Sequence, residues 1–397
     1  MTVRTAVVLA AGEGTRLRPL TRNRPKHMLP AANRPILEHV LDALVDAGID
    51  RIAVVVGYHR ERVQEYFGPT HRDVPLEYVV QAKQLGSGHA LLQARDVVDG
   101  PLVVVNGDRI IEAGSVSQIV DASESDESPA AMAYIERRNA HQYGAVTVQD
   151  RHVEEIVEKP EIDAYRLINA GIYAFDPGVF DEIEATERHA GELGLPDTIT
   201  RLIERDRVRA VKVGGLWVDA TFPWDLLEVA SEVLARGRVH EPPTREGVWI
   251  DHDAQVSTDA LVQPPVVVGA DCEVGAGAVL GPDTALGRNV TVGPNVTVQR
   301  AVLDDDTRVD AGSTLIDAVI GQDVHVGAGV VVPGGPGDVR VGREIHEDQR
   351  LGAVLADRAR AEGAVSFAPG TLVGPNATLR SGARIDGKVP EDAEVIR

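Results

Sequence analysis

The hydrophobic positions of this chain follow two different periods, one in each part of the sequence. In the first part, short apolar runs alternate with amphipathic stretches such as Ile36–Ala47 and Val116–Ala122. Strands that alternate with helices in this way predict an α/β domain with a mostly parallel sheet. The expected strands are Thr5–Leu9, Ile52–Val56, Leu76–Val80, Leu102–Asn106, Ala131–Ile135, Ala145–Gln149, Ala170–Phe175 and Val208–Val213.

The second part has a period of six. A repeat of six fits neither an α-helix nor an alternating strand, and it is typical of a triangular parallel β-solenoid in which one aliphatic residue per side points inwards. The period slips by one residue at Leu303 and at Ile320, and it returns at Phe367 after an interruption. The aliphatic positions are Ile250, Val256, Val262, Val268, Val274, Leu280, Leu286, Val292 and Val298.

These periods predict two domains. The first spans residues 1–238 and ends with a helix over Asp225–Arg236, and residues 239–249 form a linker that contains two consecutive prolines. The β-helix then spans 250–397, with an excursion at about 334–363. The excursion opens with Gly334-Gly335-Pro336-Gly337, and we expect a short helix over Leu351–Ala361.

Composition narrows the class of protein. The formal net charge is −21, which argues against nucleic-acid and anionic-membrane partners. We find no 18-residue apolar run and no basic-then-apolar N-terminus, so we expect a cytoplasmic protein without a membrane span. The single cysteine, Cys272, excludes an internal disulfide. An acidic surface with few lysines and many arginines indicates a halophile, although a GC-rich genome has the same effect on the arginine content.

A glycine-rich turn follows the first expected strand. It reads Leu9-Ala10-Ala11-Gly12-Glu13-Gly14-Thr15-Arg16, and Arg24-Pro25-Lys26 follows it. Glycines let backbone N–H groups approach phosphates, and Arg16 and Lys26 supply fixed cations. A Rossmann dinucleotide turn is the alternative, but it needs a continuing helix and a later acidic residue. Prolines at 19, 25 and 30 interrupt such a helix.

The turn and the Arg-Pro-Lys segment together resemble the signature of the sugar-1-phosphate nucleotidylyltransferases. The resemblance covers the chain, because relatives in this family, including the bifunctional N-acetylglucosamine-1-phosphate uridyltransferases and the glucose-1-phosphate thymidylyltransferases, can carry a C-terminal β-helix. It implies a Rossmann-like, GT-A-like nucleotidyltransferase domain followed by a left-handed parallel β-helix of hexapeptide repeats. It also implies Arg16 and Lys26 as catalytic residues acting on the phosphates.

Further segments match the family in its order. Gln81 and the turn Gly86-Ser87-Gly88-His89 resemble its base-recognition segment, and Asp108 and Asp219 match its two Mg²⁺ ligands. Each aspartate alone could also be a turn or a helix cap. The nucleotide-binding residues implied are Leu9, Ala11, Gly12, Gly14, Gln81, Gly86 and Ser87. The sugar-phosphate-binding residues implied are Gly144, Glu158, Lys159 and Asn169, although Glu158-Lys159 could also be a solvated charge pair.

The activity implied is transfer of a nucleotidyl group from UTP or dTTP to a sugar 1-phosphate, with Mg²⁺ as cofactor. Two alternatives stay open: a bifunctional enzyme whose β-helix acetylates an amino-sugar phosphate, and a non-catalytic regulatory subunit. The stretch that matches the catalytic His of the bifunctional relatives, Val309–Thr314, contains no His, and only His325 and His346 lie nearby. We therefore expect no acetyl transfer. The flat sides of a β-helix favour a homo-oligomer, and we expect a trimer.

Overall fold

The computed structural model describes residues 3–124, 128–137, 140, 143–158, 160, 165–205 and 208–396. The chain divides into two compact units. One combines residues 1–13 with 36–218, and the other combines residues 14–35 with 219–397. The short segment 14–35 therefore belongs with the C-terminal part of the chain rather than with the residues on either side of it. The domain boundary at 239–249 stays a prediction from the repeat.

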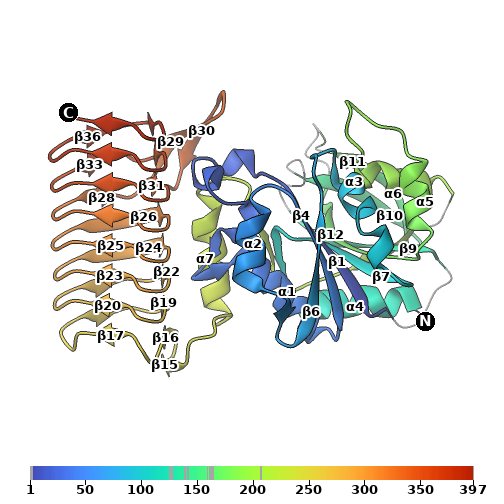
Figure 1. Cartoon of the computed structure of the whole chain (residues 1–397), viewed down its shortest axis with the longest axis horizontal. Coiled ribbons are helices and arrows are strands. Elements are labelled where there is room, and N and C mark those ends of the chain that lie inside the picture. The colour runs from blue at the N-terminus through green and yellow to red at the C-terminus, as the bar shows by residue number, and fades with distance from the viewer. Residues whose placement is uncertain are drawn as a thin grey trace. The chain divides into compact units, whose positions relative to one another are not determined.

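The first unit is built on a ten-stranded sheet of order β10-β11-β13-β9-β12-β7-β1-β4-β6-β5. Strands β7, β1, β4 and β6 are parallel neighbours, whereas β12 runs antiparallel to both β7 and β9. The sheet is thus parallel across β7-β1-β4-β6 and contains antiparallel pairs on either side of that run (Figure 1). The strands are β1 Thr5–Ala10, β4 Arg51–Val56, β5 Thr70–His71, β6 Val74–Val80, β7 Leu102–Asn106, β9 Ala130–Glu136, β10 Gly144–Gln149, β11 His152–Glu158, β12 Leu167–Phe175 and β13 Val208–Lys212.

Helices bury both faces of this sheet. All six residues of β1 are buried, as the unbroken apolar run predicts for a central parallel strand. On one face, Val7 and Leu9 pack in a cluster with residues of α3, α5 and α6. Helices α1 and α4 pack against each other, and α4 also lies against β9 and β12. The helices of this unit are α1 Ile36–Asp46, α2 Arg60–Phe67, α3 Ser87–Leu92, α4 Ala113–Glu124, α5 Val179–Glu184 and α6 Leu195–Ile203, with the 3₁₀ turn η4 Arg95–Val97.

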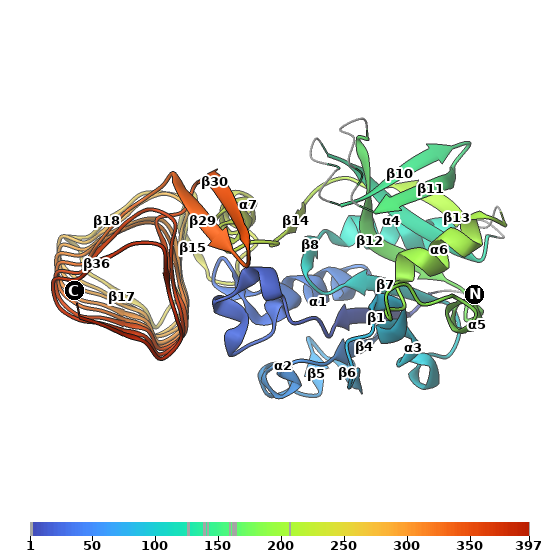
Figure 2. The same ribbon diagram turned by 90° about the horizontal axis from the view of Figure 1, so that it is seen from above.

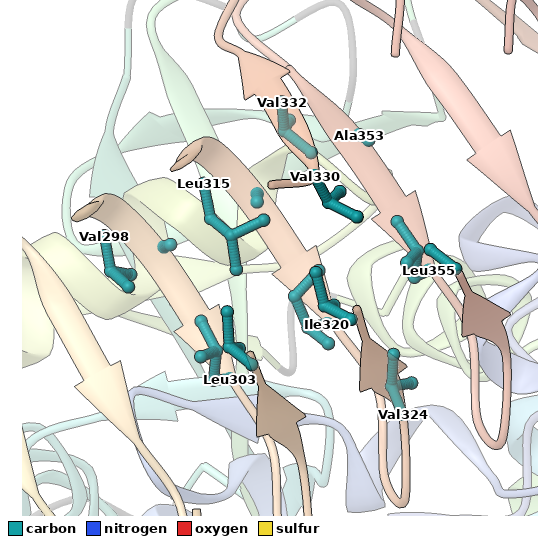
Figure 3. Close-up of a cluster of buried hydrophobic side chains, with 14 of the residues drawn as sticks. Val298, Leu303, Leu315, Ile320, Val324, Val330, Val332, Ala353 and Leu355 are labelled. Atoms are coloured by element: carbon teal, nitrogen blue, oxygen red, sulfur yellow. The ribbon is translucent and has the colours of Figure 1, made fainter. Parts of the chain in front are cut away.

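The second unit contains a parallel β-helix whose strands trace a triangle when it is seen end-on (Figure 2). Val268 pairs with Leu286, Leu286 with Leu303, and Leu303 with Ile320, so successive coils lie in parallel register. The repeating aliphatic residues form one continuous core, as Val298, Leu315 and Val332 show (Figure 3). The short slips at Leu303 and Ile320 occur in the long strands β24 and β26, each of which runs around a corner.

The corners of the coil explain the frequent Asp, Asn and Gly residues. Asp271, Asn289, Asp306 and Asp323 all have positive φ, and each occupies the same corner in successive coils. Asn and Asp tolerate this left-handed conformation better than other non-glycine residues. The coil strands are β16 Val248–Ile250, β17 Gln255–Val256, β18 Leu261–Val262, β19 Val266–Val268, β20 Glu273–Val274, β21 Val279–Leu280, β22 Thr284–Leu286, β23 Thr291–Val292, β24 Thr297–Leu303, β25 Arg308–Val309, β26 Thr314–Ile320, β27 His325–Val326, β28 Val331–Pro333, β31 Ala353–Leu355, β32 Arg360–Ala361, β33 Ser366–Phe367, β34 Thr371–Val373, β35 Thr378–Leu379, β36 Arg384–Ile385, β37 Lys388–Val389 and β38 Glu394–Val395.

The excursion differs from its prediction. It is a β-hairpin of β29 Gly337–Val341 and β30 Glu344–Gln349. The expected helix over Leu351–Ala361 is wrong, because β31 and β32 lie there and the coil resumes at Ala353. Leu351, Ala353 and Leu355 are fully buried, and this alternation serves the wall of the coil rather than a helix.

Segment 14–35 and helix α7, Asp225–Ala235, complete the second unit. The segment consists of three 3₁₀ turns, η1 Thr15–Leu17, η2 Leu20–Arg22 and η3 Lys26–Met28, followed by β2 Pro30–Ala31 and β3 Arg34–Pro35. No longer helix forms in it, as the prolines at 19, 25 and 30 predict. Helix α7 packs on β2, β22, β24 and β26. The expected linker contains β15, Pro243–Arg245, which pairs with β16.

Candidate functional site

In the first unit, the candidate residues follow the carboxyl ends of neighbouring parallel strands. Leu9 of β1 lies beside Asn106 of β7, and Ala10 lies beside Val56 of β4. Gly12 follows β1 and Asp108 follows β7. Val56 in turn lies beside Val80, the last residue of β6, which Gln81 follows. In open parallel sheets, this edge is where ligands bind.

The backbone is tightly packed at this edge. The N–H of Gly107 donates to the carbonyl of Leu9 at 3.0 Å, and a Cβ at Gly107 would lie 3.1 Å from that oxygen. The carbonyl of Ala11 accepts the side-chain amide of Gln84 at 3.1 Å. Leu9 and Ala11 are buried, and their carbonyls are occupied by these bonds. Both residues therefore shape the turn through their backbone.

Gln81 joins the turn that follows it. Its buried Nε2 donates to the carbonyl of Gly86 at 3.0 Å and lies 2.9 Å from His89 Nδ1. Burial and the positive charge of Arg188 lower the pKa of His89, so its imidazole is held neutral beside Gln81. The structure thus brings Gln81 and Gly86 together, and their role in recognising a base stays a prediction.

Gly86 and Ser87 pack against residues Leu193–Leu195, where helix α6 begins. A Cβ at Gly86, where φ is +98°, would lie 2.4 Å from the carbonyl of Leu193, so only glycine fits. The Ser87 hydroxyl accepts the N–H of Leu195 at 2.9 Å. The hydroxyl therefore stabilises the turn, and this bond uses only one of its two acceptor lone pairs.

Two arginines that the sequence reasoning missed surround Trp217. The guanidinium of Arg109 lies 5.2 Å from the ring centroid and that of Arg137 lies 5.3 Å from it. Arg109 also donates to the carbonyl of Asn169 at 3.0 Å. Both arginines are partly exposed. Arg109 directly follows Asp108, which matched the family, and this is the signal that could have found Arg109. Asp108, which precedes Arg109, is also partly exposed at the end of β7.

The residues assigned to the sugar phosphate also come together. Gly144 of β10 pairs with Glu158 of β11, and a Cβ at Gly144 would lie 3.0 Å from Glu158 Oε2. Asn169 is buried nearby, but its amide is engaged: Nδ2 donates to the Tyr173 hydroxyl at 2.7 Å and Oδ1 accepts the N–H of Gly171 at 2.9 Å. Asn169 therefore holds the irregular part of β12. Lys159 lies outside the described residues.

In the second unit, segment 14–35 carries the catalytic candidates. Gly14 has φ of +67°, and a Cβ there would lie 2.8 Å from Lys26 Cβ. The Thr21 hydroxyl donates to the carbonyl of Gly14 at 2.8 Å, which closes the turn. Arg16 is exposed, with its guanidinium 5.8 Å from the centroid of the Phe222 ring. The two cations are thus held on one compact loop.

Asp219 begins the C-terminal part of the second unit. It is the last residue of β14, Trp217–Asp219, which pairs with β8, Arg109–Ile111. The Thr221 hydroxyl donates to Asp219 Oδ2 at 3.2 Å. Asp225, the first residue of α7, accepts the N–H groups of Thr221 and Phe222, which precede the helix, and burial raises its pKa to about 6.

Carboxylate oxygens such as those of Asp108 and of Asp219 are donors that suit a divalent metal ion. No group of three His, Cys, Asp or Glu side chains within the described ranges is arranged to hold a metal ion alone. Mg²⁺ is usually bound by one or two carboxylates together with substrate phosphates and water. Asp108 and Asp219 are partly exposed carboxylates of this kind.

The two histidines of the acetyl-transfer alternative lie in different surroundings. His325 Nε2 lies 2.9 Å from Asp310 Oδ2 on neighbouring coils, and both side chains are 42% exposed. His325 thus points outwards from the wall, as its place before Val326 predicts. His346, on the hairpin strand β30, packs at a tilt of 55° against the rings of Phe222 and Trp224, with ring centroids 4.5 and 5.2 Å away.

Comparisons with known proteins agree with this layout. Residues 5–236 match the nucleotidyl transferase family, and residues 272–382 match the GMPPB C-terminal domain. A protein of Methanocaldococcus jannaschii named bifunctional protein GlmU is 32% identical over 99% of this chain and 97% of its own length. UTP–glucose-1-phosphate uridylyltransferase AglF of Haloferax volcanii is 36% identical over 55% of this chain and 92% of its own.

Solved structures show the same fold for the first part. A UDP-glucose pyrophosphorylase from Acinetobacter baumanii superposes with a TM-score of 0.52 at 26% identity, over 59% of this chain and 93% of its own. A glucose-1-phosphate thymidylyltransferase from Bacillus anthracis superposes with a TM-score of 0.55 at 27% identity, over 60% and 97%.

The fold and these motifs define a nucleotidyltransferase. The chain belongs to the sugar-1-phosphate nucleotidyltransferase family. The substrates of this family are a nucleoside triphosphate and a sugar 1-phosphate. Within the part of the chain that the structure describes, no helix is long and apolar enough to cross a membrane.

Proposed function

We propose that this enzyme transfers a uridylyl or thymidylyl group to a sugar 1-phosphate and releases pyrophosphate. The products are UDP- or dTDP-glucose, or UDP-N-acetylglucosamine. One observation carries the proposal: the glycine-rich turn follows β1, Gln81 follows β6 and Asp108 follows β7. All three strands belong to the parallel run β7-β1-β4-β6, and these residues lie at the sheet edge where ligands bind.

The chemistry follows from the charges of the substrates. A phosphate oxygen of the sugar 1-phosphate attacks the α-phosphorus, the bond from this phosphorus to the bridging oxygen breaks, and pyrophosphate leaves. The nucleophile is already an anion at neutral pH, so no general base is needed. The barrier lies in bringing two anions together and stabilising the leaving group, and positioning with fixed positive charge lowers it.

The residues of the chain divide this work. Gly12 and Gly14 offer backbone N–H groups to the β- and γ-phosphates, and Arg16 and Lys26 neutralise them. Gln81, Gly86 and Ser87 bind the base. Gly144, Glu158 and Asn169 bind the sugar, and we assign its phosphate to Lys159.

A divalent metal belongs to this chemistry, and we assign it as Mg²⁺. When bound, it would neutralise the α-phosphate. Asp108 and Asp219 would hold it, because both are partly exposed carboxylates; Asp108 follows β7 by two residues and Asp219 ends β14. Oxygen ligands of this type suit Mg²⁺.

The choice of nucleotide and sugar rests on relatives. The name of the Haloferax volcanii relative specifies UTP and glucose 1-phosphate, and that of the Bacillus anthracis structure specifies a thymidylyltransferase for glucose 1-phosphate. The Gly86-Ser87-Gly88-His89 turn favours UTP.

Pyrophosphate release over a matrix of UTP, dTTP, ATP and GTP with glucose, N-acetylglucosamine and galactose 1-phosphates tests the proposal. Absence of release in every combination with Mg²⁺ would contradict it.

A bifunctional enzyme is the second candidate. The relatives that match the whole chain are named bifunctional. Among the described residues of the coil wall, Asp310 and His325 form the one histidine–carboxylate contact near the stretch Val309–Thr314. We nevertheless assign no acetyl transfer to this chain, because that pair is half exposed. The regulatory-subunit alternative is disfavoured because Arg16, Lys26 and Asp108 are all present.

We further propose that the protein is a trimer, because flat sides of a β-helix suit packing around an axis. Light scattering measures the mass directly, and a monomeric mass of 42.5 kDa would contradict this proposal.

A further inference from the structure

A buried ionic cluster joins the signature segment to the β-helix within the second unit. Arg24, which precedes Pro25-Lys26, is 2% exposed. Its Nη1 donates to Asp304 Oδ2, and its Nη2 donates to Asp357 Oδ1 at 3.0 Å. The aspartates are 7% and 2% exposed. Arginines are seldom buried to this extent without paired carboxylates.

The two carboxylates come from coils that are not adjacent. Asp304 follows β24 and Asp357 follows β31, and the coil of β26 lies between these strands. Gly321 follows β26 at this corner, and a Cβ there would lie 2.6 Å from Asp357 Oδ1. The absence of a side chain at Gly321 leaves room for both carboxylates to reach one guanidinium. The planar fork of Arg24 thus spans three coils, which a lysine ammonium would not match.

Each aspartate also accepts a backbone N–H group. Asp304 Oδ1 accepts the N–H of Asp305 at 2.9 Å, and Asp357 Oδ1, the oxygen that Arg24 binds, also accepts the N–H of Gln322 at 3.1 Å. Burial alone would lower the pKa of Arg24, but the charges of Asp304 and Asp357 outweigh it and raise the pKa. The guanidinium is therefore always charged, and its position is set by the coil backbone.

Lys26 follows Arg24 by two residues, and the intervening Pro25 restricts the backbone between them. Lys26 starts η3, in which Met28 and Leu29 donate to the carbonyls of Pro25 and Lys26. We propose that Asp304 and Asp357, acting through Arg24, hold this segment in the conformation that nucleotidyl transfer requires. Arg24 is then a positioning residue, and the β-helix takes part in turnover of the first part of the chain.

This inference rests on the proposed role of Lys26 in catalysis. Its first test is Asp304→Asn and Asp357→Asn in the full-length protein, with kcat and KM measured at a temperature where circular dichroism shows the variants folded. We expect kcat to fall by about 10- to 100-fold and KM to change less, because misplacement by about 1 Å can cost 10²-fold in rate. The kcat of Arg24→Lys should lie between the kcat of these two variants and that of the wild type.

Two controls separate positioning from general damage. Asp317→Asn removes a carboxylate that is 2% exposed and bound to Arg300 at 2.6 Å in the same β-helix, but it does not touch Arg24. Glu391→Gln removes an exposed contact between Arg22 and the last coil. Both controls should keep the wild-type kcat per folded molecule. If Asp304→Asn and Asp357→Asn also kept it, or if Asp317→Asn lost as much, the inference would be wrong.

Amide hydrogen exchange over residues 20–32 tests the anchor without any turnover. We expect exchange at Met28 and Leu29 to become at least tenfold faster in Asp304→Asn and Asp357→Asn, and to stay unchanged in Asp317→Asn. Unchanged exchange in the first two variants would overturn the anchor. A wild-type enzyme inactive on every substrate, with faster exchange in these variants, would instead overturn the proposed function and leave the anchor intact.

Discussion

Gly14 packs directly against Lys26, and a Cβ at Gly14 would lie only 2.8 Å from the Cβ of Lys26. Its φ of +67° adds strain for any other residue. We expect Gly14→Ala to lower the free energy of unfolding by about 1–2 kcal/mol and to reduce kcat, because Lys26 must shift. Urea unfolding and initial rates measure both. If Gly14→Ala were as stable as the wild type, the turn would not be packed against Lys26 as described.

Gly12→Ala is the matched comparison. Gly12 does not have positive φ, and nothing within its own unit lies within 4 Å of the position of an added Cβ. The free energy of unfolding should therefore stay within about 0.5 kcal/mol of wild type. If phosphates approach this backbone, KM for the nucleotide should rise by about tenfold. An unchanged KM would argue against phosphate binding at Gly12.

Lys26→Ala and Asp108→Ala should each reduce turnover by at least about 10²–10³-fold, because each removes a charge that acts on the phosphates. Steady-state rates with saturating Mg²⁺ measure the loss, and circular dichroism checks folding. Lys212→Ala, on an exposed residue of the first unit outside the matched segments, is the control and should keep its rate. A near-wild-type rate for Asp108→Ala would remove Asp108 from the metal site.

Cys272 should be inert in the folded protein. It is fully buried, its thiol donates to the carbonyl of Gly287 at 3.0 Å, and burial raises its pKa to about 12. Because the thiolate reacts, we expect disulfide exchange with Ellman's reagent at pH 8 to be on the order of 10³-fold slower than in guanidinium. Rapid labelling of the native protein would mean that this coil opens easily.

Asp225 should make stability depend on pH. Burial raises its pKa from 3.8 to about 6, although N–H groups of Phe222 and Thr221 partly oppose the shift. The folded state then binds this proton more tightly than the unfolded chain, so its contribution to stability is present below about pH 4 and is lost as the pH rises to 6. The loss is up to about 3 kcal/mol.

Urea unfolding of wild type and Asp225→Asn from pH 4 to 7 isolates this contribution, since other groups cancel in the difference. The variant keeps an oxygen that can accept the two N–H groups. We expect wild type to lose stability relative to the variant as pH rises. A difference that does not change with pH would contradict the assignment.

Acetyl transfer should be absent. Acyl transfer to an amine needs a base such as His near the nucleophile, and the matching stretch Val309–Thr314 has none. Release of free thiol from acetyl-CoA, with glucosamine 1-phosphate or galactosamine 1-phosphate, measures the activity. Turnover that disappears in His325→Ala or in His346→Ala would restore the bifunctional hypothesis, and would identify which histidine is the base.

The local sequence was sufficient for much of the fold. Each expected strand of the first part is present, because unbroken apolar runs such as Leu102–Val105 can only be buried. The period of six likewise predicted the inward residues of the coil, from Val268 to Ile385. Both patterns depend on which side chains must be buried away from water, and the order of residues along the chain determines that.

The tertiary structure alone decided the partners of the polar residues. Asp304 sits in a run of three acidic residues that looks like a solvated surface, yet it is buried against Arg24, 280 positions away in the sequence. The helix expected over Leu351–Ala361 was wrong for a related reason, because the alternation after Leu351 fits a coil wall that only neighbouring coils create. Hydrophobic periodicity predicts which residues are buried, but it does not predict which distant charged residue a buried polar group will contact.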